Sequence, residues 1–274
     1  RVSTYVDAVY NNYMEHSGVS LLLATFFFTF QIYCDFAGYS LIAIGSSKMM
    51  GFTLMENFHR PYFAKSIKEF WRRWHISLTT WFRDYIYIPL GGSRAGKWKS
   101  FRNTLVIFLV SGFWHGANWT FVAWGAYHAL LFLPLLLLGQ NRRYRDSVAE
   151  NSFLPSVKEL TQMGATFLLV LLGWILFRSE DISQAAVYLE RMFNVSLFSA
   201  PQLVGLGFGQ LLLKKCFFFT ALMFVVEWIG RKQAHGLMIE DLSLPVRYVI
   251  YTVLLIIIYG FDASNPQGFI YFQF

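Results

Sequence analysis

The 274-residue sequence contains few charged residues and very few cysteines. Only 14% of its residues are Asp, Glu, Lys or Arg, whereas 55% are hydrophobic. A soluble domain of this length needs more charge to cover its surface, so the composition excludes that class and indicates an integral membrane protein. The two cysteines, Cys34 and Cys216, lie in apolar segments without metal-ligand spacing. They are interpreted as small buried hydrophobic residues rather than a disulfide, and no metal site is predicted.

Long apolar runs predict several membrane-spanning helices, because a bilayer core about 30 Å thick needs roughly 20 apolar residues in an α-helix. Such runs, two of them short, occupy residues 19–45, 104–138, 160–177, 216–228 and 246–261. The second run has no Asp, Glu, Lys or Arg over 35 residues and is too long for one upright span. We expect it to break near Gly112, Gly116 and Gly125. Five or six membrane segments are therefore expected in an all-α, polytopic transmembrane fold.

Two further stretches are expected to connect these spans. Residues 179–193 begin with Ser and acidic side chains and then continue with helical periodicity, which predicts a short amphipathic helix with an N-cap. The polar run 140–158 is the most loop-like stretch. The chain begins at Arg1 without a charged-then-apolar signal pattern, and we expect it to be the C-terminal portion of a longer protein with earlier spans.

Positive charge is concentrated between Lys48 and Arg102, a region that holds 11 of the 23 Lys and Arg residues. The acidic residues in the same region are Glu56, Glu69 and Asp84. The positive-inside rule therefore predicts that this region faces the cytoplasm or lies at that interface.

Residues 66–92 predict an interfacial helix with two faces. Apolar side chains recur at steps of four and three: Ile67, Trp71, Trp74, Leu78, Trp81 and Tyr85. A basic and polar set falls on a different face: Lys68, Arg72, His75 and Thr79. A helix of this kind lies naturally in a membrane interface, which accounts for its arginines without catalysis. Pro89 and the Gly91-Gly92 pair then predict a turn or re-entrant corner.

His75 lies among these cations, which favour the neutral form of its imidazole. A neutral imidazole beside the bilayer can serve as a base or as a hydrogen-bond donor. It can equally well bind a backbone carbonyl, and the residues alone leave both interpretations open.

Polar side chains inside apolar runs are candidate functional residues, because each needs a partner or a water-filled cavity. The set consists of Asp35, Glu227, His115, Asn118 and His128. For Asp35 a structural bond, for instance to an arginine of residues 66–92, is favoured over a functional role. Glu227 is predicted to lie near an interface. His128 follows His115 by 13 residues, so the two would face apart on an unbroken helix.

His115 is the strongest catalytic candidate. Gly112 and Gly116 flank it at a spacing that permits close backbone approach, and Trp114 and Trp119 are expected to wall it. Such a pocket excludes bulk water, and histidine is the commonest general base near neutral pH. The residues by themselves leave catalysis and hydrogen bonding between helices equally open.

Four blocks occur in order over about residues 29–130: "QIYCDFAGYS", "NFHRPY", "EFWRRWHISLTTWFRDYIYIPLGG" and "SGFWHGANWTFVAWGAYH". They resemble consecutive blocks of the membrane-bound O-acyltransferase family, in the bacterial branch of alginate and polysaccharide O-acetyltransferase membrane subunits. The terminal "FIYFQF" also suits this branch. Residues 140–260 match it only in helical hydropathy. The resemblance implies one domain over residues 1–274, with interfacial and re-entrant helices around a tunnel.

The resemblance also implies a chemistry. It makes His115 the essential histidine and His75 a supporting one, with Asn118 and Trp114 orienting His115. Asp35 and His128 are further supporting candidates, and His128 has no assigned role. The acyl donor would be acetyl-CoA or another acyl thioester from the cytoplasm, with no tightly bound cofactor. The acceptor would be an exported SGNH-type acetyltransferase or other polysaccharide machinery at the bacterial inner membrane. Membrane lipids are expected as partners, and nucleic acid is not.

Two other functions suit a polytopic chain with buried histidines. In a proton-coupled transporter or channel component, Asp35, His115 and His128 would line a path, and pseudo-repeated halves would be common. No internal repeat is visible in the sequence. In a structural scaffold, the histidines would serve only as hydrogen-bonding groups. The four ordered blocks favour acyl transfer over both.

Overall fold

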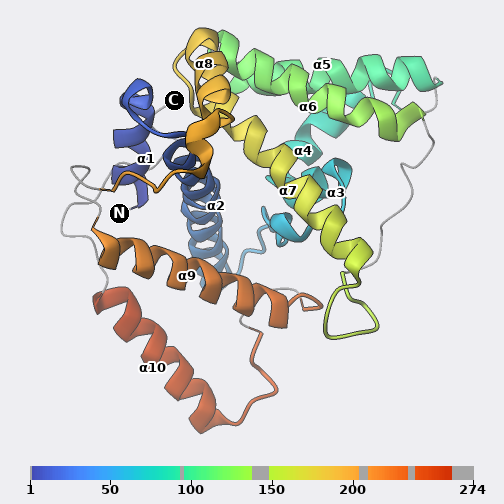
Figure 1. The fold of residues 1–274 in the computed structure, drawn as a ribbon. Helices are drawn as coiled ribbons and strands as arrows, with labels where there is room; N and C mark the ends of the chain where they lie inside the picture. The colour runs from blue at the N-terminus through green and yellow to red at the C-terminus, as the bar shows by residue number, and fades with distance from the viewer. Residues whose placement is uncertain (1, 93–95, 138–147, 204–208, 234–237, 261–274) are drawn as a thin grey trace.

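The computed structural model describes residues 2–92, 96–137, 148–203, 209–233 and 238–260. Within these ranges the regular structure is helical and contains no strand (Figure 1), which confirms the predicted all-α class. The helices are α1 Val2–Asn11, α2 Gly18–Met49, α3 Ile67–Arg73, α4 Ile76–Phe82, α5 Lys97–His115, α6 Trp119–Leu137, α7 Val157–Arg178, α8 Ile182–Met192, α9 Gln210–Ile229 and α10 Leu244–Gly260. A π-helical turn, Arg83–Tyr87, continues α4. Short 3-10 turns cover Tyr13–Glu15, Pro61–Phe63 and Val195–Phe198.

Three of the described helices, α2, α6 and α7, are long and apolar enough to cross a membrane. The other predicted runs also form helices, with properties that keep them out of this group. Helix α5 begins with cations at Lys97, Lys99 and Arg102, α9 carries Lys214 and Lys215, and α10 has only 17 residues. Three of the five or six expected membrane spans are therefore confirmed among the described residues. Helices α9 and α10 lie at the opposite end of the molecule from α5 and α6 (Figure 1).

The apolar run 104–138 divides into α5 and α6, which lie side by side as a hairpin (Figure 1). The break falls after His115, where Gly116 caps α5. Two glycines allow the backbones to touch. A Cβ atom at Gly112 would lie 2.2 Å from the Phe121 carbonyl oxygen, and one at Gly125 would lie 2.2 Å from that of Phe108. The predicted break is confirmed, and its glycines serve close helix packing.

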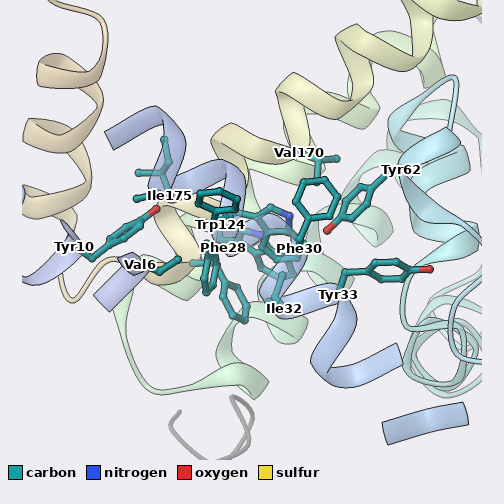
Figure 2. Close-up of a cluster of buried hydrophobic side chains, with 14 of the residues drawn as sticks. Val6, Tyr10, Phe28, Phe30, Ile32, Tyr33, Tyr62, Trp124, Val170 and Ile175 are labelled. Atoms are coloured by element: carbon teal, nitrogen blue, oxygen red, sulfur yellow. The ribbon is translucent and has the colours of Figure 1, made fainter. Parts of the chain in front are cut away.

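An aromatic core joins α1, α2, α6, α7 and α8 and supports this hairpin. Figure 2 shows core residues from α1, α2, α6 and α7. Tyr10 of α1 stacks on Tyr188 of α8 with ring centroids 4.5 Å apart. Phe28 of α2 meets Trp174 of α7 edge to face at 6.5 Å, and Trp174 stacks on Trp124 of α6 at 6.1 Å. Aromatic pairs of this kind add stability beyond the apolar area that they bury.

Residues 66–92 do not form the single interfacial helix that the periodicity predicts. Helix α3 ends at Arg73, and His75 has left-handed backbone angles (φ 43°, ψ 56°) before α4 begins. Hydrogen bonds from residues 57–59 explain the break. The Arg73 carbonyl accepts from the His59 backbone N–H at 3.0 Å, and the Ile76 N–H donates to the Asn57 carbonyl at 2.9 Å. These bonds replace those that would have continued the helix.

The predicted aromatic stripe divides with the helix. Trp74 is 2% exposed and packs in the core, and Trp71 packs against Trp124 with ring centroids 5.5 Å apart. Trp81 is 51% exposed. The prediction that all three tryptophans share one helix face embedded in the membrane interface is therefore wrong. The predicted turn is confirmed, since Gly91 and Gly92 have φ angles of 100° and 57°.

The amphipathic connector is confirmed as α8, whose N-cap Asp181 accepts from the Gln184 backbone N–H at 2.8 Å. The polar run 140–158 ends earlier than predicted, because Ser156 and Glu159 form a capping box that starts α7 at Val157. Residues 138–147 lie outside the described part, as do the terminal residues 261–274 that include "FIYFQF".

The separation of the tryptophans makes a stability prediction. Trp74→Ala should cost about 3–5 kcal/mol of unfolding free energy, as is typical for a large aromatic removed from a core. Trp81→Ala, the matched control, should change it by less than about 0.5 kcal/mol. Thermal unfolding of the two variants in detergent measures the difference. Equal losses would show that Trp74 and Trp81 have equivalent surroundings.

Candidate active site

A cavity of about 620 Å³ lies between α3, α4, α5 and α6 and contains both predicted catalytic histidines. Its walls are formed by Lys68, Trp71, Arg72, Trp74, His75, Leu78, Thr79, Phe82, Arg83, Tyr87, Thr104, Ile107, Phe108, Ser111, His115, Phe132, Leu135 and Leu136. His75 and His115 are 40 residues apart in the sequence. The breaks before α4 and after α5 therefore place both at the same cavity.

His115 is the last residue of α5 and sits in an aromatic setting. Its ring packs edge to face against Phe177 of α7 and Trp124 of α6, with ring centroids 5.0 Å and 5.4 Å apart. Trp114 also contacts it at 5.0 Å, as predicted. Trp119 does not wall the site, since it is 77% exposed. The turn after Gly116 reverses the chain, so the next helix presents Trp124 rather than Trp119 to His115.

His75 occupies the break between α3 and α4 and is buried. Burial lowers the pKa of His75 to about 4, although a hydrogen bond to its own backbone partly opposes this. Its imidazole is therefore neutral near pH 7, as predicted, but the dominant cause is desolvation rather than the neighbouring cations. The Trp114 ring lies 6.3 Å from the His75 ring, so Trp114 contacts both histidines.

The cavity has a cationic side and an apolar side. Lys68, Arg72 and Arg83 contribute to its lining from α3 and the π-helical turn. Phe132 and Leu135 contribute from the last turns of α6. The basic helix face that was predicted to lie at the membrane interface thus lines the cavity. The apolar side chains of α6 next to it can contact an apolar part of a ligand.

The remaining candidates are not among the residues that line this cavity. The Asn118 side chain donates to the Glu180 carbonyl at 2.6 Å and accepts from the Thr120 N–H at 3.0 Å, which fixes the turn between α5 and α6. His128 is 1% exposed and accepts a hydrogen bond from the Trp71 indole at 3.4 Å. Asp35 is half-buried on α2.

Two hydrogen-bonded contacts, one beside His75 and one on α2, could not be predicted from the sequence pattern. The Ser77 hydroxyl lies 3.4 Å from His75 Nδ1 and donates to Asn57 Oδ1 at 2.5 Å. Glu227, predicted to be interfacial, accepts a hydrogen bond from the Tyr33 hydroxyl. Asn57 opens the block "NFHRPY", which is the one signal that pointed to this segment.

The sequence pattern of the MBOAT, membrane-bound O-acyltransferase, family matches residues 2–146 of this chain, which include the whole cavity. The chain belongs to the membrane-bound O-acyltransferase family. The resemblance noted in the four blocks is thereby confirmed, and the match extends from α1 through α6. Together with the three apolar helices, this membership identifies a membrane protein.

Individual proteins are also similar to this chain. A probable alginate O-acetylase of Pseudomonas aeruginosa is 44% identical over 191 residues, which are 68% of this chain and 35% of the relative. A peptidoglycan O-acetyltransferase of Helicobacter pylori is 34% identical over 192 residues, 70% of this chain and 35% of the relative. A teichoic acid D-alanyltransferase of Bacillus subtilis is 33% identical over 169 residues, 58% of this chain and 41% of the relative. The chain thus spans about a third of the length of the alginate and peptidoglycan relatives.

Proposed function

We propose that this chain forms the catalytic core of a membrane O-acyltransferase that passes an acetyl group from a cytoplasmic thioester toward an exported polysaccharide. The observation that carries the proposal is the shared cavity, where His75 and His115 arrive from two separate family blocks. Relatives named for alginate, peptidoglycan and teichoic acid support a polymer of the cell envelope as the final acceptor.

In this proposal His115 acts as the general base. Its neutral imidazole takes the proton of an acceptor hydroxyl or thiol while that oxygen or sulfur attacks the thioester carbonyl carbon. A new carbon–oxygen or carbon–sulfur bond forms, and the bond to the thiol of the donor breaks. The departing sulfur receives the proton from the His115 imidazolium. His75 supports the reaction from the same cavity, where an unprotonated imidazole nitrogen can accept a hydrogen bond from the acceptor group.

The two sides of the cavity suit the two parts of such a donor. The phosphate groups of acetyl-CoA or of a phosphopantetheine carrier would bind Lys68 and Arg72, since charge-assisted hydrogen bonds to phosphate are strong. Arg83 on the same side is paired with the Asp84 carboxylate at 2.7 Å. The acyl thioester would extend toward Ser111 and His115. With the basic region 48–102 at the cytoplasmic face of a bacterial inner membrane, the donor would enter from that side.

The proposal is tested by incubating membranes that contain the protein and its polysaccharide-modifying partner with acetyl-CoA labelled in the acetyl group. Labelled, ester-linked acetate on polysaccharide is the expected product. Its absence with acetyl-CoA and with an acetylated carrier protein, in membranes where the protein is abundant, would contradict acyl transfer. Coupled proton and solute movement without ester formation would instead favour the transporter.

The cationic side makes a separate prediction about donor binding. The Lys68→Ala/Arg72→Ala double variant should raise the KM for acetyl-CoA by at least about tenfold, because each charged hydrogen bond is worth roughly 1.5–3 kcal/mol. The KM for acetyl-pantetheine, which lacks the phosphates, should change by less than about threefold, which corresponds to less than half of one such bond. Lys48→Ala is the matched control, since Lys48 is exposed and lies outside the cavity. Equal rises for both donors would show that these cations do not recognise phosphate.

A further inference from the structure

A chain of hydrogen bonds leads from His75 away from the cavity to α2. His75 Nδ1 lies 3.4 Å from the Ser77 hydroxyl oxygen, which lies 2.5 Å from Asn57 Oδ1. The Asn57 amide nitrogen donates to the Ser40 hydroxyl of α2 at 3.2 Å. Ser40, Asn57 and Ser77 come one each from the first three family blocks.

The direction of each hydrogen bond in this chain follows from a single backbone group. The Ser77 backbone N–H donates to Asn57 Oδ1 at 3.2 Å, and an N–H can only donate. The oxygen of the Asn57 amide therefore faces Ser77, and its nitrogen faces Ser40. Because Asn57 Oδ1 can only accept, the Ser77 hydroxyl donates its hydrogen bond to Asn57. The Ser77 oxygen then presents lone pairs to His75 Nδ1.

We propose that Ser77 and Asn57 are positioning residues that hold His75 in its Nδ1-protonated tautomer, which leaves Nε2 as the unprotonated nitrogen. The tautomer of a histidine is set by the hydrogen bond that its other ring nitrogen makes. This role rests on the proposed function, because it matters only if the His75 imidazole takes part in acyl transfer.

The backbone around His75 supports the same role. The left-handed conformation of His75 costs free energy for a residue with a side chain, and surrounding structure must hold it. The bonds from Asn57 to the backbone of Ile76 and to Ser77 supply that hold. Asn57 thus fixes the ring position through the backbone and the ring tautomer through the Ser77 hydroxyl.

The experiment measures kcat and KM of acetyl transfer from acetyl-CoA in membranes that contain the intact protein. Ser77→Ala should lower kcat by at least about tenfold, with KM nearly unchanged. Loss of a group that orients a metal-bound histidine has an effect of this size. Ser77→Thr, which keeps the hydroxyl, should restore activity. Asn57→Asp, which keeps the acceptor for Ser77, should also remain active. Thr80→Ala, a hydroxyl loss in the same helix outside the cavity, is the control.

The decisive comparison repeats Ser77→Ala in a His75→Ala background. If Ser77 acts through His75, the second loss should nearly disappear, because residues that act as a unit are strongly non-additive. If the kcat losses of Ser77→Ala and His75→Ala instead multiply in an active, abundant double variant, the positioning role is overturned while the proposed function stands. An unchanged kcat for Ser77→Ala, or inactivity of folded Ser77→Thr and Asn57→Asp, would also overturn the positioning role. A wild-type protein that transfers no acetyl group would overturn the proposed function and this role with it.

Discussion

His115→Ala is expected to lower acetyl transfer by at least about a hundredfold, since a general base contributes typically 10²–10⁴-fold. Membrane abundance should fall much less. Hydrogen bonds of side chains in membrane proteins average only about 0.6 kcal/mol, and the rings of Phe177 and Trp124 beside His115 also pack against each other. The measurement is ester-linked acetate on polysaccharide, divided by the amount of folded protein in the membrane.

Two other histidines provide the comparison for this result. His75→Ala should be impaired less than His115→Ala if its role is supporting. His128→Ala should show the opposite pattern, with reduced abundance and near-normal acetylation for each folded molecule, because His128 is buried behind Trp71. Equal loss of specific activity in His115→Ala and His128→Ala would contradict the separation of His128 from the reaction.

Gly125→Ala is expected to lower stability sharply although it adds a single methyl group. The new Cβ would lie 2.2 Å from the Phe108 carbonyl oxygen, so α5 and α6 would have to move apart. Overpacking of this kind costs about 1–3 kcal/mol, and occasionally more. The same movement would displace His115 at the end of α5, so acetyl transfer should fall together with the thermal unfolding midpoint in detergent.

Gly164→Ala is the matched control for Gly125→Ala. Gly164 lies within α7, and a Cβ there meets no atom within 4 Å. Alanine is favoured over glycine in a helix by about 1 kcal/mol, so this variant should be unchanged or more stable. A Gly125→Ala protein that unfolds at the same temperature as Gly164→Ala would show that α5 and α6 do not meet as described.

The features that the sequence predicted well are those encoded locally. The length of the apolar run 104–138 and its glycines were sufficient to predict that α5 and α6 separate beside His115. The apolar runs likewise predicted the positions of α2 and α7. The family blocks identified both histidines that now share a cavity, an arrangement that neither spacing nor periodicity could show.

The features that could not be predicted from the sequence depend on contacts between distant segments. The helical period across residues 66–92 is unbroken in sequence, yet backbone groups of Asn57 and His59 interrupt it in space. Trp119 neighbours His115 in sequence, but the turn at Gly116 leaves it exposed. The sequence pattern of Lys68 and Arg72 is typical of an interfacial helix face. The break before α4 places both cations at the cavity.

The most direct test of a proton-transferring His115 is acetylation by a His115→Gln protein in membranes with its partner, measured beside the abundance of that variant. Glutamine keeps a hydrogen-bonding amide and much of the side-chain volume, but it cannot carry a proton at neutral pH. We expect a well-inserted protein that is as inactive as His115→Ala. Near-normal acetylation by His115→Gln would contradict the base assignment and make this histidine a structural hydrogen-bonding group.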